Sequence, residues 1–181
     1  KRWLNKMEVF EKLLDPELYA YFKNATFYEN PVFHTAHKMV DFYIEFENVI
    51  PLEIYEQIIT KLQLSLHAHV KLHMHTKNCV IEMDELDRYV NYFVEKYNDV
   101  KDFRFLHPYL ENDTICFSTR DESRLAALNL ALPSLMEKLE DVGITQEIVC
   151  KKVEDDIEIE TAKVQVSAPV VKQEPVKKQY P

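Results

Sequence analysis

The spacing of apolar residues predicts that the chain begins with helix and continues into a sheet. Apolar residues recur at helical spacing between residues 3 and 14. Between residues 40 and 46 apolar and polar residues alternate, which is typical of a strand with one buried face. Together with residues 25–30 this stretch predicts two antiparallel strands. Helical spacing returns between residues 52 and 62, and Pro51 fits the first turn of that helix.

The next stretch, HAHVKLHMH at residues 67–75, predicts a strand with a histidine-rich outer face, because apolar and polar residues alternate along it. The apolar positions are Ala68, Val70, Leu72 and Met74, and the polar positions are His67, His69, Lys71, His73 and His75.

These histidines raise the question of a metal site. Two histidines at i and i+2 on a strand lie about 6.6 Å apart, so one pair could share a Zn²⁺ ion. The whole stretch spans about 26 Å, so the four cannot converge on one ion, and each pair would need ligands from elsewhere, such as Asp41, Glu45 or Cys79. We therefore expect a solvated strand face and no metal site. The candidate ligands for the alternative are His67, His69, His73 and His75.

A second series of elements is predicted from residue 84 onward. Residues 84–97 have helical spacing. Residues 99–113 are expected to form an irregular connection or to hold a short strand at FRFL. The stretch TICFS, residues 114–118, predicts a strand.

A leucine-rich helix is predicted after this strand. Thr119 and Glu122 match a capping box at its start, and Pro133 is expected to kink it. Gly143 is suited to end it in the C′ position. Residues 145–153 then predict a final strand.

The predicted fold class is α+β, with two small two-layer α/β sandwich modules that each contain a β-α-β repeat. We expect a first domain at residues 1–77 (helix, hairpin, helix, strand) and a second at residues 78–153 (helix, strand, helix, strand). Residues 154–181 contain three prolines and have no sustained period, so they are expected to be a flexible linker to a downstream domain.

Composition excludes several classes of enzyme. The chain has one glycine, Gly143, whereas phosphate-binding loops, dinucleotide fingerprints and nucleophile elbows need several. Its 31 acidic and 22 basic side chains give a net charge of −9, which disfavours direct binding to nucleic acid. Three separated cysteines indicate reduced thiols and, without a signal peptide or membrane span, a cytoplasmic protein.

Two stretches carry a resemblance to a known family. HKMVDFYIEFENVIPLEIYEQIITKLQLSLHAHVKLHMHT, residues 37–76, resembles the first N-terminal domain of PolC-type DNA polymerase III. NDTICFSTRDESRLAALNLALPSLMEKLEDVGI, residues 112–144, resembles the second N-terminal domain of that family. The resemblance covers about residues 7–153 and consists of strand and helix patterns without catalytic motifs.

The resemblance implies that this segment is a non-catalytic part of a replicative polymerase. The parent chain would be a DNA-directed DNA polymerase with a 3′–5′ exonuclease, but neither the exonuclease acids nor the polymerase aspartates have counterparts here, and no cofactor is expected. The first domain is similar to the polymerase-binding domain of the clamp-loader tau subunit, which implies a role in protein interaction. DNA would be contacted only through downstream parts of the parent chain.

Exposed tyrosine and phenylalanine side chains are favoured at the centres of protein interfaces. The candidates for partner binding are Tyr19, Tyr21, Phe33 and Tyr43. One alternative is a KH-like module that binds nucleic acid, although such a module needs a GxxG clamp that a chain with one glycine cannot supply. A further alternative is a metal-binding domain built on the histidines.

Overall fold

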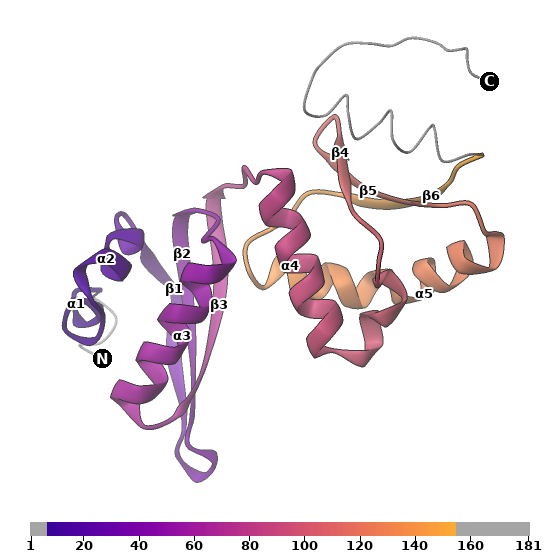
Figure 1. The fold of residues 1–181 in the computed structure, drawn as a ribbon. Coiled ribbons are helices and arrows are strands. Elements are labelled where there is room, and N and C mark those ends of the chain that lie inside the picture. The colour runs from indigo at the N-terminus through magenta and orange to yellow at the C-terminus, as the bar shows by residue number, and fades with distance from the viewer. Residues whose placement is uncertain (1–6, 155–181) are drawn as a thin grey trace. The chain divides into compact units, whose positions relative to one another are not determined.

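The computed structural model describes residues 7–154, which form two compact units (Figure 1). The first unit contains residues 7–89 and 136–145, and the second contains residues 90–135 and 146–154. Each unit has its own three-stranded sheet. The predicted α+β class with two small modules is therefore confirmed.

The first unit pairs a β-hairpin with a strand that follows a helical crossover. Its elements are α1 (Val9–Leu13), α2 (Pro16–Tyr19), η2 (Ala20–Phe22), β1 (Thr26–His34), η3 (Thr35–His37), β2 (Met39–Asn48), α3 (Leu52–Leu66) and β3 (His69–Asn78). The strand order is β1-β2-β3, with β1 antiparallel and β3 parallel to β2. Because a parallel pair needs a crossover, α3 lies between its two strands in the chain.

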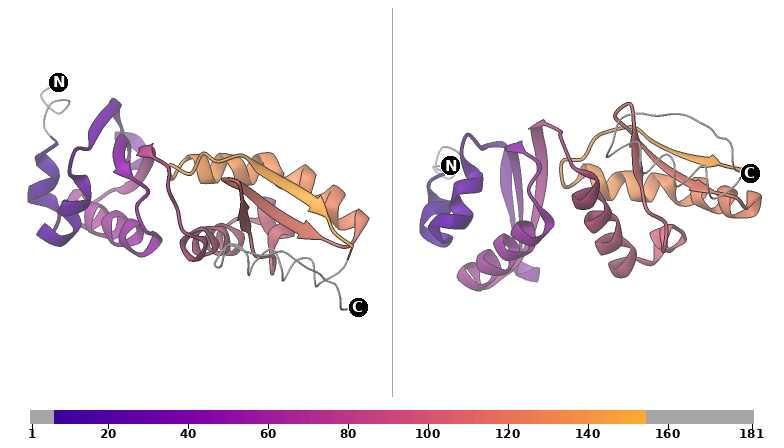
Figure 2. Two further views of the ribbon diagram at one scale, coloured as in Figure 1. Left: turned by 90° about the horizontal axis from the view of Figure 1, so that it is seen from above. Right: turned by 45° about the horizontal axis from the view of Figure 1, so that its top comes forward.

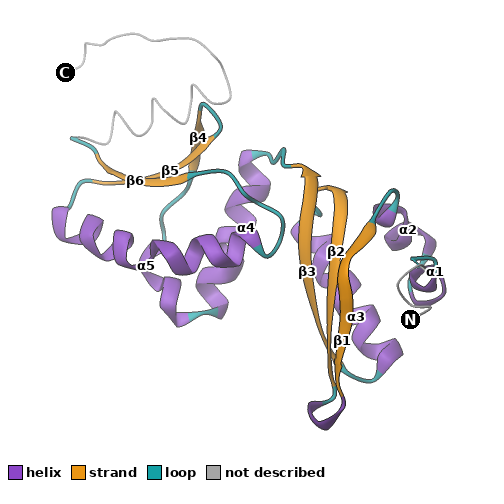
Figure 3. Cartoon of the chain, turned by 180° about the vertical axis from the view of Figure 1, so that it is seen from behind, coloured by secondary structure: helices purple, strands orange, loops and turns teal. Residues whose placement is uncertain are grey.

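The buried face of the first sheet packs against the helices. Phe42 and Phe46 of β2 are fully buried. The ring of Phe10 in α1 lies 5.3 Å from that of Phe42, and the ring of Phe22 in η2 lies 5.0 Å from that of Phe46. Helix α3 covers the same sheet (Figure 2). In Figure 3, which shows the chain from behind, the strands lie in front of this helix. Helices α1 and α3 therefore lie on the same face of the sheet.

The second unit repeats the strand pairing of the first. Its elements are η4 (Asn98–Phe103), β4 (Tyr109–Glu111), β5 (Thr114–Thr119) and β6 (Ile148–Lys152), together with parts of α4 (Met83–Lys96) and α5 (Glu122–Glu140). The strand order is β4-β5-β6, with β4 antiparallel and β6 parallel to β5. Both units therefore contain a hairpin followed by a β-α-β crossover.

The units do not follow the linear division predicted from the sequence. Residues 136–145, the last turn of α5 and the connection after it, belong to the first unit because they pair with β3. The predicted boundary after residue 77 lies inside the first unit, which continues to Tyr89 of α4. Trp3 and Leu4 of the predicted first helix, and all of the predicted linker except its first residue, lie outside the described residues.

Two local predictions are wrong in detail, and a third is confirmed. FRFL forms the end of η4 and a turn, and the strand that precedes β5 begins at Tyr109. The start of α5 is capped by Asp121, whose Oδ1 accepts a hydrogen bond of 3.1 Å from the Ser123 backbone, so Thr119 and Glu122 do not form a capping box. Gly143 occupies the predicted C′ position: its φ is 86°, its amide donates to the Glu140 carbonyl at 3.0 Å, and the Ile144 amide donates to the Leu139 carbonyl at 2.9 Å, which is a Schellman motif.

No described helix is long and apolar enough to cross a membrane.

Candidate interaction face of the first sheet

Two tyrosine–histidine stacks lie on the sheet face opposite α1 and α3. Tyr43 of β2 and His73 of β3 are direct partners in the parallel pairing, and their rings stack 4.7 Å apart at an interplanar angle of 11°. The rings of Tyr28 and His75 stack 3.7 Å apart at 7°. Tyr28 also meets Tyr43 edge to face at 5.9 Å. We call these four side chains the tyrosine–histidine face.

An irregularity in β1 brings both Tyr28 and Glu29 opposite Tyr43. Phe27 pairs with Ile44, and Glu29 pairs with Tyr43, so Tyr28 is an extra residue between two paired positions. A bulge of this kind changes which face a side chain points to. Tyr28 follows Phe27 of the buried face, so alternation places it on the opposite face, whereas the bulge changes the register of the residues after it.

The buried carboxylate of Asp41 contacts both His73 of this face and His34 at the end of the β1–β2 hairpin. Asp41 of β2 is 8% exposed. Its Oδ1 lies 2.9 Å from His73 Nε2, and its Oδ2 lies 2.8 Å from His34 Nε2. Burying a carboxylate is costly unless it is hydrogen-bonded, and the two histidines satisfy both of its oxygens.

His73 lies between two carboxylates. Its second ring nitrogen, Nδ1, is 2.8 Å from Oδ1 of Asp141. A carboxylate can only accept, and a neutral imidazole can donate from one nitrogen only, so both contacts are hydrogen bonds only when His73 is protonated. The hydrogen bond to Asp141 is the main cause that raises the pKa of His73, and the bond to Asp41 adds to it against the opposing effect of burial.

The pKa values of the other groups follow from the same arrangement. Burial acts to raise the pKa of Asp41, but the hydrogen bonds from His73 and His34 outweigh it and lower that pKa. Burial, with the charges of Asp141 and Glu29, raises the pKa of Tyr28 to about 12. Tyr28 and Tyr43 therefore both lie near carboxylates, so the surroundings of the tyrosine–histidine face are negatively charged.

The segment after α5 adds backbone pairing to the edge of β3. The Met74 amide donates to the Asp141 carbonyl at 2.9 Å, and Met74 forms a parallel bridge with Val142. The hydroxyl of Thr76 donates to the Gly143 carbonyl at 2.8 Å. Gly143 has a φ of 86°, and a Cβ there would lie 2.5 Å from Cγ2 of Thr76. This segment brings Asp141 to His73.

The four predicted partner residues do not form one cluster. Tyr43 is part of the tyrosine–histidine face. Tyr19 stacks on Phe22 at 6.0 Å, on the helical side of the sheet, and Tyr21 in η2 is 39% exposed. Phe33 is 47% exposed and pairs with Val40 of the buried face. Of the four candidates, Tyr43 is the one that lies on the tyrosine–histidine face.

The four histidines also have different positions. His67 is not on the strand, because it ends α3 in the left-handed conformation with φ 53° and ψ 46°. His69 is the exposed first residue of β3, whereas His73 and His75 belong to the face described above. Among residues 7–154 no group of three or more side chains has the arrangement of a metal site.

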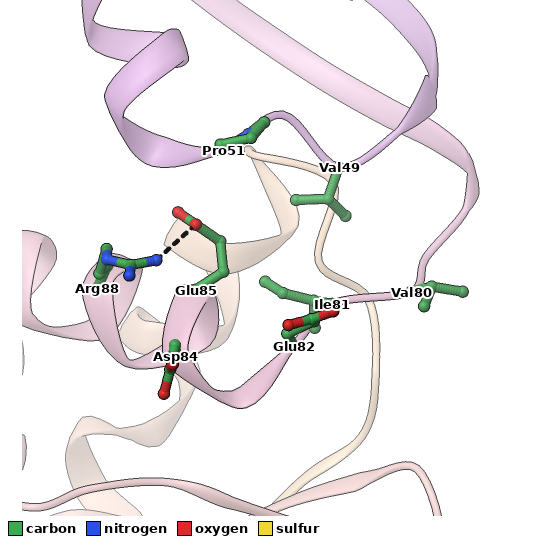
Figure 4. Close-up of a pocket in the computed structure, with 8 residues that line it drawn as sticks. All are labelled: Val49, Pro51, Val80, Ile81, Glu82, Asp84, Glu85 and Arg88. Carbon is green, nitrogen blue, oxygen red and sulfur yellow. Dashed lines mark hydrogen bonds and ion pairs between the residues drawn. The ribbon is translucent and has the colours of Figure 1, made fainter.

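A hollow of about 290 Å³ lies where the start of α4 meets the start of α3 (Figure 4). Glu85 accepts a hydrogen bond of 2.7 Å from the Leu52 amide and pairs with Arg88 at 2.8 Å. The first of these contacts satisfies the Leu52 amide at the start of α3, which gives Glu85 a structural role. The lining residues are Val49, Pro51, Val80, Ile81, Glu82, Asp84, Glu85 and Arg88.

By its fold the first unit is a two-layer α/β domain with helices on one face of a mixed sheet. Residues 7–75 match the family described as DNA polymerase III polC-type N-terminus I. The predicted resemblance of the first domain is confirmed, and the match indicates a role in DNA replication. No curated protein matches the chain.

Proposed function

We propose that this chain is a non-catalytic interaction module of a replicative polymerase in the cytoplasm, and that its tyrosine–histidine face docks another replisome protein. The observation that carries the proposal is the pair of stacked rings, Tyr43 on His73 and Tyr28 on His75. Aromatic side chains that are partly exposed and already fixed in position lose little entropy when a partner covers them. The resemblance of the first domain to a clamp-loader domain makes the tau subunit the first partner to test.

The acidic charge of the first unit favours a partner with a basic surface. The described part of the first unit contains 17 acidic and 8 basic side chains. Besides burial, the charges of Glu29 and Asp141 raise the pKa of both tyrosines, and Asp41 also raises that of Tyr43. A guanidinium group could stack on a tyrosine ring and remain near these carboxylates.

Titration calorimetry of the chain with purified tau tests the proposal. We expect Tyr43→Ala and Tyr28→Ala each to weaken binding by about tenfold, in the range of interface anchors, while circular dichroism is unchanged. Tyr21→Ala is the matched control, because Tyr21 is a partly exposed tyrosine of the same unit on the helical side. Absence of any binding by the unaltered chain at tens of micromolar would refute the proposal.

A further inference from the structure

A phenylalanine occupies a turn position that favours glycine. The Leu106 amide donates to the Phe103 carbonyl at 3.2 Å, which closes a four-residue turn. Arg104 has φ −60° and ψ 137°, and Phe105 has φ 66°. These are the features of a type II turn, whose third residue needs a positive φ and is usually glycine or asparagine. A bulky residue there is a strained exception.

The fold gains no buried apolar surface from this ring. Phe105 is 83% exposed, whereas its neighbour Phe103 is fully buried and packs edge to face on Phe117 with ring centroids 4.8 Å apart. Phe103 therefore anchors the turn in the core, and glycine in place of Phe105 would relieve the strain. Strained residues that the fold does not need often mark functional sites.

The turn is held firmly by a helix of the same unit. Arg124 of α5 donates through Nη2 to the carbonyl of Asp102 at 3.0 Å and to that of Arg104 at 2.9 Å. The Arg104 amide donates to the Lys101 carbonyl at 2.9 Å. The ring is thus presented on a fixed backbone, which reduces the entropy lost when a partner binds it.

The neighbouring side chain adds a charge beside the ring. The guanidinium carbon of Arg104 lies 5.5 Å from the centroid of Phe105, and Arg104 forms no ion pair with another described residue. A surface that receives both side chains would offer an apolar pocket with a carboxylate at its rim. Phenylalanine and arginine together are typical of the centre of a protein interface.

We propose that Phe105 and Arg104 form a second docking contact, and that the partner is a protein with an apolar pocket bordered by a carboxylate. A nucleic-acid ligand is disfavoured because the described part of the second unit has nine acidic and seven basic side chains, so phosphates would not be neutralised. The inference rests on the proposed function, because it assigns this contact to the same partner, tau.

Four variants of the whole chain separate the contribution of the ring from that of the strain. Phe105→Gly removes both, Phe105→Ala removes the ring and keeps the strain, and Phe105→Trp keeps an aromatic ring. Leu130→Ala is the matched control, because Leu130 is 84% exposed on α5 of the same unit with ordinary helical backbone. Melting temperature and calorimetric affinity for tau are measured for each.

We expect Phe105→Gly to raise the melting temperature by roughly 2–4 °C, since it relieves the strain. Phe105→Gly and Phe105→Ala should both weaken tau binding at least about tenfold, and Phe105→Trp and Leu130→Ala should bind within about threefold of the unaltered chain.

Several results would overturn the inference. If the unaltered chain binds tau and both Phe105→Gly and Phe105→Ala bind equally well, the second contact is wrong and the proposed function remains. If the unaltered chain does not bind tau, both proposals fail. A lower melting temperature for Phe105→Gly would show that the ring is structural. Binding of oligothymidylate that depends on Phe105 would show that the ring stacks on bases instead.

Discussion

At the scale of single residues, the position of His73 has a consequence for stability. Its two ring nitrogens meet Asp41 and Asp141, and this raises its pKa above the ordinary value of 6.5. A group whose pKa is higher in the folded state stabilises the fold fully below its unfolded pKa, and the contribution disappears as pH rises through the folded value. The contacts of His73 with the two carboxylates therefore stabilise the fold fully only below about pH 6.5.

We predict that the stability difference between the unaltered chain and His73→Gln decreases as pH rises above 6.5. Glutamine keeps a polar side chain of similar reach but cannot carry the positive charge. Thermal unfolding followed across this range measures the difference, and His69→Gln, at the exposed start of β3, is the control. A difference that did not change with pH would contradict a protonated His73.

The histidine-rich strand can be recognised in the sequence, but the residues that its histidine side chains contact cannot. The alternation from Val70 to Met74 is local, so it predicts which face each side chain occupies. Asp141 follows His73 by 68 residues, and no local pattern could reveal their contact. The turn at Phe105 could not be predicted either. A type II turn is recognised in a sequence from a glycine at its third position, and that position is phenylalanine here.

At the scale of elements, the connection after α5 depends on Gly143. Its backbone φ is positive, and a Cβ atom would collide with Thr76 Cγ2 at 2.5 Å. Strand β3 and this connection must therefore separate or distort if any other residue stands there. The sequence marked Gly143 as the end of a helix, and its close approach to β3 became visible only in three dimensions.

We predict that Gly143→Ala destabilises the chain by roughly 1–3 kcal/mol, from the backbone strain and the collision together. In a chain with Thr76→Ser, which keeps the hydroxyl that bonds the Gly143 carbonyl but removes Cγ2, the same change should cost less. Denaturant unfolding of the four chains forms a double-mutant cycle. Equal costs in both backgrounds would mean that the collision is relieved in another way.

At the scale of the whole molecule, charge is divided unevenly. In the described residues the first unit has 17 acidic and 8 basic side chains, and the second has nine and seven. The net charge of −9 was evident from composition, but its concentration in the unit that carries the tyrosine–histidine face required the structure. Composition contains no information about the side on which charges gather.

We predict that raising the salt concentration from about 50 to 300 mM weakens tau binding by several-fold, because screening reduces attraction between the acidic unit and a basic partner. The loss should be smaller in a chain with Glu29→Gln, which removes one of the carboxylates beside Tyr28. Calorimetry at two salt concentrations measures both. An affinity independent of salt would mean that charge does not guide this association.

The segment that returns from α5 to β3 limits how this protein can be divided for study. The stretch shared with the polymerase family ends at residue 75, but the amide of Met74 finds its partner at Asp141. A gene fragment that stops after β3 would encode a sheet with an unpaired outer strand, and such edges associate with other copies. A soluble, monomeric first unit therefore requires residues 136–145, supplied by the intact chain or joined to the fragment through a designed loop.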